Sequence, residues 1–161
     1  MEFEIRKGTV RDEAWIVPLL RTGTAAGHFG PTVAQQAPQL INVAATGASF
    51  TMVKLRNGKQ EFRSVSAELA VAECKGTPVS FLVLLHDSSE HEAHLAGTVV
   101  EFQRQGAFSA LLKNVLKTTA TGEQVIARCY SESVVAQSIL LKNGFCVRGH
   151  GNPTELVWTC T

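Results

Sequence analysis

Apolar and polar residues recur along this chain with two periods, and the two periods divide it into elements. Alternation with a period of two predicts strands, whereas apolar residues three or four positions apart predict helices. The alternating or apolar runs that we interpret as strands are 3–6, 50–55, 61–65, 68–73, 78–85, 93–100, 125–130, 145–148 and 155–160. The helical runs are 14–20, which Thr9 or Asp12 can cap, followed by 32–44, 107–119 and 133–143.

Turns that contain glycine separate these runs. Asn57-Gly58 lies between two alternating runs and predicts a hairpin, because Asn-Gly favours two-residue turns. Gly47 and Gly144 are expected to end the second and the last helix. The order is a strand, two helices, a run of antiparallel strands, and then β-α-β-α-β-β. It predicts a single α+β domain over residues 1–161, with helices flanking a mixed, mostly antiparallel sheet.

Composition narrows the class of protein. The chain has 161 residues, of which 45% are hydrophobic and 18% charged, as in a globular domain. The net charge is +1 and there is no basic stripe, so nucleic acid is not an expected partner. No run approaches the ~20 apolar residues that span a membrane, and residues 1–7 lack a signal-peptide pattern. Cys74, Cys129, Cys146 and Cys160 form no C-x-x-C pair, so we expect reduced thiols and a cytoplasmic location.

The stretch 98–112 carries the clearest ligand signal. An apolar strand passes through a polar turn around Gly106 and becomes a helix. The free N–H groups and the dipole at a helix N-terminus favour phosphate, and Gln103 and Arg104 add side-chain donors. Such a turn is common, so by itself it indicates a phosphate site and nothing more specific.

Three segments together resemble the GNAT superfamily of acyl-CoA-dependent N-acetyltransferases. Residues 69–82 resemble the family's central hairpin, and residues 136–145 resemble its late helix with the following Gly-Phe. The turn resembles its pyrophosphate loop, Arg/Gln-x-x-Gly-x-Gly/Ala. Gln103 and Gly106 match this motif, whereas Phe108 stands where a small residue is usual.

The resemblance implies that acetyl-CoA, or a related acyl-CoA, lies between two splayed parallel strands, here 93–100 and 125–130. An N–H group left unpaired by the splay would stabilise the oxyanion of the reacting thioester. The turn would hold the pyrophosphate, and the strand end would hold the pantetheine arm. The implied binding residues are Thr98, Val99, Val100, Gln103, Arg104, Gln105, Gly106, Ala107, Phe108, Ser109 and Ser133, the last of which is also a candidate helix N-cap.

Transfer of an acyl group to an amine by direct attack in a ternary complex needs a base. Glu92 and His94 lie on one face of the strand before the loop, at the spacing of the catalytic histidine pair of the arylalkylamine branch. We place Glu92 ahead of His94 as the base. The alternative is that both are polar residues at the exposed start of a strand.

The acid is less well defined. The family's usual tyrosine position in the late helix is occupied by Leu140, and the single tyrosine of the chain is Tyr130. Tyr130 is therefore the candidate acid, although its ring can equally serve packing alone. The loss of the usual tyrosine also motivates an alternative function, a non-catalytic acyl-CoA sensor or partner-binding module.

Two further expectations concern metals and the acceptor. The segment 86–94 is rich in histidine and carboxylates, but its spacing is not H-E-x-x-H and it is interpreted as a turn and a strand, so no metal is expected. The resemblance implies that the acceptor side lies in 20–45, where Arg21 and His28 are the basic groups. The residues of this segment do not identify the acceptor amine. A homodimer is also compatible with the sequence, because a second subunit can complete such a site.

Overall fold

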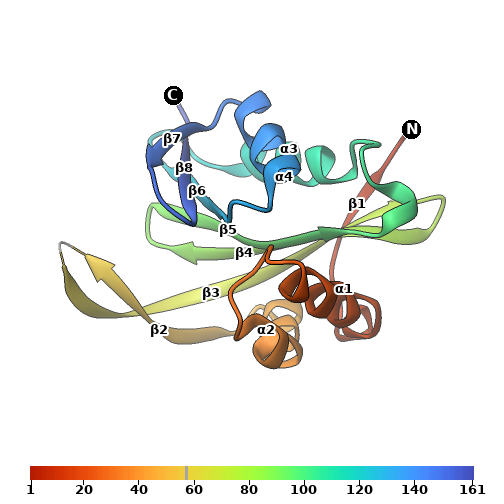
Figure 1. Cartoon of the computed structure of the whole chain (residues 1–161), viewed down its shortest axis with the longest axis horizontal. Helices are drawn as coiled ribbons and strands as arrows, with labels where there is room; N and C mark the ends of the chain where they lie inside the picture. Colours follow the sequence, from red (N-terminus) through yellow and green to blue (C-terminus); the bar gives the residue numbers. More distant parts are fainter. Residues whose placement is uncertain (57) are drawn as a thin grey trace.

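A computed structural model describes residues 1–56 and 58–161, and one mixed sheet organises them (Figure 1). In this part of the chain eight strands pair in the order β1-β3-β4-β5-β6-β8-β7, with β2 pairing along β3. All pairs are antiparallel except β5 and β6, which run parallel. The strands are β1 (Glu4–Lys7), β2 (Ser49–Arg56), β3 (Lys59–Cys74), β4 (Thr77–Asp87), β5 (Glu90–Thr98), β6 (Gln124–Cys129), β7 (Cys146–Gly149) and β8 (Thr154–Thr159). The helices are α1 (Glu13–Ala25), α2 (Val33–Thr46), α3 (Ala107–Thr118) and α4 (Val134–Lys142), with short 3-10 turns η1 (Val10–Asp12) and η2 (Val100–Phe102).

Helices cover both faces of the sheet, α1 and α2 on one face and α3 and α4 on the other (Figure 1). Alternation along β4 supplies a core on each side. Phe81 and Val83 pack with α1 and α2, whereas Leu82 and Leu84 pack with α3 and α4. This arrangement confirms the predicted α+β class, a mostly antiparallel sheet flanked by helices with one parallel strand pair.

The four predicted helices are present, with bounds close to those expected. Gly47 follows α2 in the left-handed conformation, with a φ of 69°. Gly144 stands two residues after α4 with a φ of 90°. Both glycines therefore supply the left-handed residue that commonly ends a helix.

The junction between β1 and α1 is held by a buried carboxylate. Asp12 accepts hydrogen bonds from the Arg6 guanidinium at 2.9 Å, from Trp15 Nε1 at 2.8 Å and from the Thr9 N–H at 2.8 Å. Burial raises the pKa of Asp12, but these donors outweigh it and lower that pKa to about 2. Thr9 and Asp12 form the capping box of η1, so both predicted capping residues lie at this helix start.

The strand β3 corrects one prediction. The runs 61–65 and 68–73, expected as two strands, are one strand of 16 residues. β2 pairs with its first half and β1 with its second, whereas β4 pairs along the other edge. Continuous pairing with β4 keeps the backbone extended through 66–68, where alternation alone suggested an interruption.

The strand β5 also differs from the expected run 93–100. It begins at Glu90, directly after the tight turn Ser88-Ser89, and ends at Thr98, after which η2 bends the chain. A bulge interrupts its pairing with β4, because Leu84 pairs with Ala93 and Val83 with Leu95. His94 is therefore the extra residue of the bulge, a feature that re-aims side chains next to functional sites.

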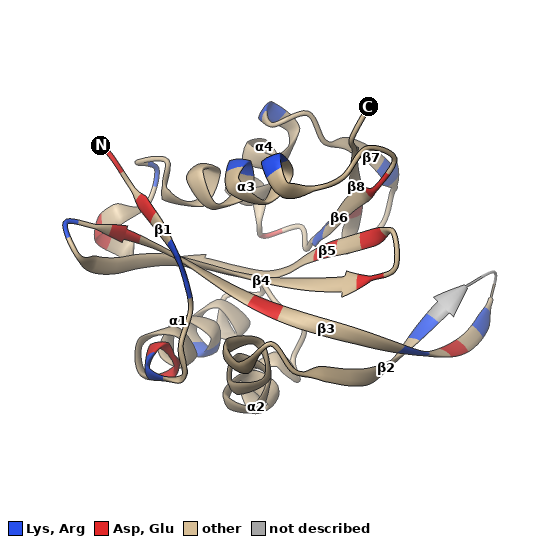
Figure 2. Ribbon diagram, turned by 180° about the vertical axis from the view of Figure 1, so that it is seen from behind, with Lys and Arg blue, Asp and Glu red and all other residues tan. Residues whose placement is uncertain are grey.

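The charged residues are nearly balanced in sign, 15 Lys and Arg against 14 Asp and Glu. Positions of both signs are distributed over the strands, and α2 carries neither (Figure 2). The backbone of β2 and β3 forms the predicted hairpin, but Asn57 of its turn lies outside the described residues. Within those described residues, no helix combines the length and the apolar character that crossing a membrane requires.

Candidate functional site

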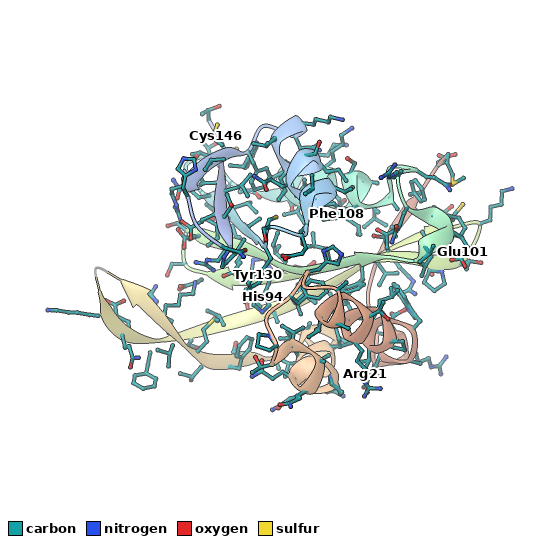
Figure 3. The ribbon with its side chains drawn as sticks, viewed as in Figure 1. Arg21, His94, Glu101, Phe108, Tyr130 and Cys146 are labelled. Atoms are coloured by element: carbon teal, nitrogen blue, oxygen red, sulfur yellow. The ribbon has the colours of Figure 1, made fainter. Side chains whose placement is uncertain are left out.

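A cavity of about 750 Å³ opens between the two layers of helices. Its walls come from the segment that joins α1 to α2, from β5 and β6, from the turn before α3, and from the start of α4. Figure 3 shows His94 and Tyr130 near the middle of the molecule, between the helical layers, whereas Arg21 lies away on the α1 side. The expected basic residue Arg21 is exposed and does not line this cavity.

The cavity exists because two parallel strands separate. β5 and β6 pair from Glu90 with Gln124 to Ala93 with Ala127, and in the described chain this pairing goes no further. β5 then continues to Thr98 and β6 to Cys129 along diverging paths. Backbone groups of both strands consequently face the cavity, where an extended ligand can take the place of a neighbouring strand.

The turn between η2 and α3 lies at one end of the cavity. Arg104 has a φ of 60° and Gly106, the N-cap of α3, a φ of 94°, so the turn uses left-handed backbone twice. No side chain of the described residues caps α3, which leaves the N–H groups of its first turn available. Gln103 Nε2 donates to the Thr98 carbonyl at 3.2 Å and ties the turn to the end of β5.

Glu92 and His94 form a hydrogen-bonded pair in the cavity wall. His94 Nδ1 lies 3.0 Å from Glu92 Oε1, and Arg128 Nη1 lies 3.1 Å from the same oxygen. Burial raises the pKa of the Glu92 carboxyl, but the hydrogen bond with His94 and the charges of His94, Arg128 and Lys54 outweigh it and hold that pKa below its usual value. An ionised carboxylate only accepts hydrogen bonds, so His94 Nδ1 carries a hydrogen in this contact, and Nε2 is the ring nitrogen left to exchange a proton with a ligand.

Comparison with known proteins identifies the architecture. No protein-family model matches the chain, and no curated protein matches its sequence. The PaiA N-acetyltransferase of Thermoplasma acidophilum in complex with coenzyme A is 16% identical, with a TM-score of 0.70 over 99% of both chains. Ard1 of Thermoplasma volcanium is 15% identical, with a TM-score of 0.70 over 100% of this chain and 99% of that one. A GNAT-superfamily phosphinothricin acetyltransferase of Sinorhizobium meliloti with acetyl-CoA is 16% identical, with a TM-score of 0.67 over 98% and 88%.

The chain has the GNAT fold. At identities of 15–16% the likeness shows the architecture alone.

Most of the predicted site residues line the cavity. Val99 instead packs beside it with Cys74 and Val79, and Gln105 donates from Nε2 to the Glu101 carbonyl at 2.7 Å. The predicted residues in the cavity wall are Glu92, His94, Thr98, Val100, Gln103, Arg104, Gly106, Ala107, Phe108, Ser109, Tyr130 and Ser133.

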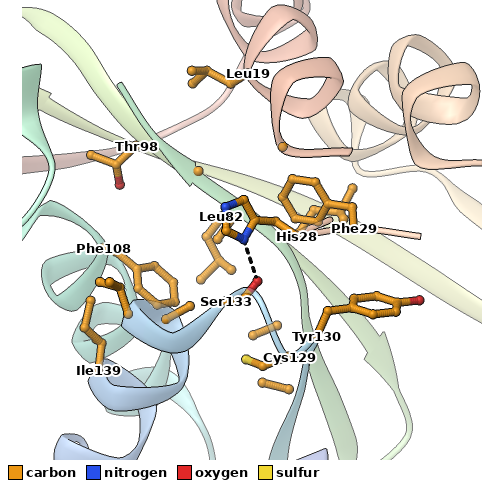
Figure 4. Close-up of a pocket in the computed structure, with 18 of the residues that line it drawn as sticks. Leu19, His28, Phe29, Leu82, Thr98, Phe108, Cys129, Tyr130, Ser133 and Ile139 are labelled. Atoms are coloured by element: carbon orange, nitrogen blue, oxygen red, sulfur yellow. Dashed lines mark hydrogen bonds between the residues drawn. The ribbon is translucent and has the colours of Figure 1, made fainter. Parts of the chain in front are cut away.

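Two residues distinguish this GNAT fold from the motif described above. Phe108, in the first turn of α3, is half-buried against the core beneath α3 and also lines the cavity. Leu140 is 2% exposed in the same core and offers no proton. Figure 4 places Phe108 beside Ile139 at the edge of the cavity, so the aromatic ring narrows that part of the cleft.

The segment between α1 and α2 reaches across the cavity. His28 Nδ1 lies 3.0 Å from Ser133 Oγ, a contact between residues 105 positions apart (Figure 4). Ser133 stands at the N-cap of α4, but its side chain makes no cap hydrogen bond, contrary to the capping role we expected. Nearby, a Cβ added to Gly30 would lie 3.2 Å from the Tyr130 hydroxyl, so that hydroxyl abuts the same segment.

Sequence reasoning missed three features of this site. The His28–Ser133 contact and the Arg128–Glu92 ion pair join residues far apart in the chain, and no local pattern announces either. The bulge at His94 leaves no signal in the alternation around it. Cys129 also lines the cavity, and burial raises the pKa of its thiol to about 11, which keeps the thiol protonated.

Proposed function

We propose that this chain binds acetyl-CoA, or a related acyl-CoA, between β5 and β6 and transfers the acyl group to an amine. One observation carries the proposal: the splayed strand pair and the uncapped N-terminus of α3 open into the same cavity. A helix N-terminus favours the pyrophosphate, and an unpaired strand edge favours the amide groups of the pantetheine arm.

Binding would then divide along the cavity. The N–H groups from Arg104 to Ser109 would hold the pyrophosphate, with the Arg104 guanidinium as a further donor. Backbone groups of β5 near Thr98 and Val100 would meet the pantetheine arm. Ser133 would contact the arm from α4 once its contact with His28 is exchanged for one with the ligand.

For proton transfer we favour His94 as the acceptor and Glu92 as its positioning partner. The low pKa of Glu92 makes the carboxylate a weak base, but it fixes the His94 ring and stabilises the imidazolium. This reverses the order that we assigned from the sequence, where Glu92 came first.

The reaction is direct attack. The amine nitrogen loses a proton to His94 Nε2 and forms a bond to the thioester carbon, and the C–S bond breaks as the oxyanion collapses. The sulfur takes a proton from Tyr130 or leaves as the thiolate into solvent. Tyr130 is the candidate acid because it is the single tyrosine of the chain and lines the cavity, whereas Leu140 is apolar.

The alternative is an acyl-CoA sensor without turnover. Its motivation is the apolar Leu140 and the large Phe108 in the cavity wall. Both functions require acyl-CoA binding, so turnover separates them.

The test is titration calorimetry with acetyl-CoA, followed by thiol release over a panel of small amines and peptides. We expect binding, and an Arg104→Glu substitution to weaken it about tenfold or more through loss of a charge-assisted contact. Arg21→Glu, at an exposed arginine outside the cavity, is the matched control. Binding without turnover across the panel would favour the sensor, and absence of binding would refute both functions.

A further inference from the structure

Four side chains form a line across the sheet, outside the cavity described above. His86 of β4 and His91 of β5 are directly opposite each other in the antiparallel register. Glu68 of β3 lies beyond His86, and Glu123, just before β6, lies beyond His91. The line therefore joins three strands and the start of a fourth.

The two imidazoles face each other through the same type of nitrogen. His86 Nδ1 lies 3.0 Å from His91 Nδ1, and the ring planes are 74° apart. On the outer sides, His86 Nε2 lies 3.1 Å from Glu68 Oε2, and His91 Nε2 lies 3.0 Å from Glu123 Oε2. Every ring nitrogen of the pair thus has a defined neighbour.

The carboxylates decide where the ring hydrogens are. An ionised carboxylate accepts hydrogen bonds and cannot donate, so each Nε2 that faces one carries a hydrogen. In the neutral form of both rings, each Nδ1 then presents a lone pair to the gap between the two rings. Two such lone pairs 3.0 Å apart repel, and a cation bound by both nitrogens, to one side of the line that joins them, converts the repulsion into two favourable contacts.

We propose that His86 and His91 bind a divalent transition-metal ion between their Nδ1 atoms, with Zn²⁺ as the representative ion. Two imidazole nitrogens about 2.0–2.1 Å from one ion, at angles of roughly 90–110°, are about 2.9–3.4 Å apart, which includes the observed separation. Metal-binding histidines characteristically donate their other N–H to a carboxylate, as Glu68 and Glu123 accept here. Imidazole suits Zn²⁺, Ni²⁺ and Cu²⁺.

The coordination sphere would be completed by water. In the described chain no third His, Cys, Asp or Glu converges with others on a metal position, so the protein contributes two ligands. The side chain of His86 is one-third exposed, and a hollow of about 350 Å³ lined by Lys7, Ser66, Glu68 and His86 adjoins it. The ion would cross-link β4 to β5 near the start of β5, one residue before Glu92. Spacing along the chain did not predict it, because the imidazoles meet only through strand pairing.

The test uses the full chain after treatment with a chelator. Titration calorimetry with Zn²⁺ should show one ion per chain, and His86→Gln or His91→Gln should weaken binding at least 50-fold. Glu68→Gln and Glu123→Gln should weaken it about 10- to 100-fold, as loss of a supporting carboxylate does. His150→Gln, which removes an exposed histidine between β7 and β8, should change nothing.

A second measurement guards against variants that fail to fold. Zn²⁺ should raise the melting temperature of the parent chain and of His150→Gln, but not of the His86 or His91 variants. In ¹⁵N-histidine spectra Zn²⁺ should shift Nδ1 of both rings and leave Nε2 protonated. The proposal is overturned if Zn²⁺ binding survives in both histidine variants, or if the Nδ1 pair shares a proton that Zn²⁺ does not displace.

Discussion

One carboxylate oxygen organises the proposed catalytic residues. Glu92 Oε1 contacts both His94 Nδ1 and Arg128 Nη1, and Arg128 Nη2 also reaches Glu155 at 3.1 Å. His94 is the extra residue of the bulge in β5, and its ring contacts Glu92 two residues earlier on the same strand. The pair is held from the neighbouring strand β6 through Arg128.

At the residue scale, the two members of this pair should differ in their effect on turnover. With an acceptor from the amine panel, His94→Gln should lower kcat by about 10²-fold or more through loss of the proton acceptor. Glu92→Gln should lower it about tenfold, because the ring keeps its nitrogen and loses its orientation. Thiol release measures both, and acetyl-CoA affinity should stay within about threefold.

The reverse ranking, with Glu92→Gln the more damaging variant, would make Glu92 itself the proton acceptor. His150→Gln again serves as the matched control, since it removes an exposed imidazole distant in sequence from this pair.

At the scale of elements, the junction of β1, β3 and α1 depends on Asp12 and Arg6. Arg6 also pairs with Glu73 of β3, so one guanidinium joins the first strand, the central strand and the first helix. Asp12 is 3% exposed, and loss of its charge would remove the acceptor of the Arg6 guanidinium, the Trp15 indole and the Thr9 N–H at a buried position.

Asp12→Asn should therefore lower the free energy of unfolding by about 2–4 kcal/mol at neutral pH. Because the folded pKa of Asp12, about 2, lies below the unfolded value of about 3.9, its contribution is complete above pH 4. It is lost as the pH falls from about 4 toward 2. Urea unfolding at several pH values measures this, with Glu4→Gln at an exposed position of β1 as the control.

If the stability difference between Asp12→Asn and the parent stays constant from pH 5 to pH 2, the carboxylate is not the group responsible.

The elements themselves were largely predictable, since alternation and glycine turns locate the four helices and most strands. The errors lie where pairing overrides local pattern. β3 is one strand because β2 pairs with its residues 59–66 and β4 with its residues 66–74, so the pairing is unbroken. β5 begins at polar Glu90 because both β4 and β6 pair with it there. Among site residues, the loop around Gly106 was found from its local turn chemistry. The His28–Ser133 contact was not, because it depends on how distant segments fold together.

At the scale of the whole molecule, the segment between α1 and α2 connects the two helical layers across the cavity. Its contacts with the region after β6 include His28 to Ser133, at 3.0 Å, and the approach of Gly30 to the Tyr130 hydroxyl. An exposed hydrogen bond of this kind contributes about 0.5–1.5 kcal/mol.

His28→Ala should therefore speed amide hydrogen exchange in residues 26–31 by about 2- to 10-fold, because local opening no longer breaks this bond. Ser133→Ala should have the same effect, and the double variant should add nothing further, as for two partners of one contact. Exchange measured by mass spectrometry is the readout, with residues 107–118 of α3 as the internal control. Additive effects of the two substitutions would show that they act separately.

The parting of β5 from β6 also has a mechanical consequence. Four register pairs join the sheet formed by β1 to β5 to the sheet formed by β6, β8 and β7, and beyond Ala93 the seam is open. A ligand that hydrogen-bonds to both edges would act as an interior strand, closing the seam and stiffening the two halves into one body. A bound ligand would then reduce the relative motion of the two halves of the sheet, and it would be a structural component of the protein while it is bound.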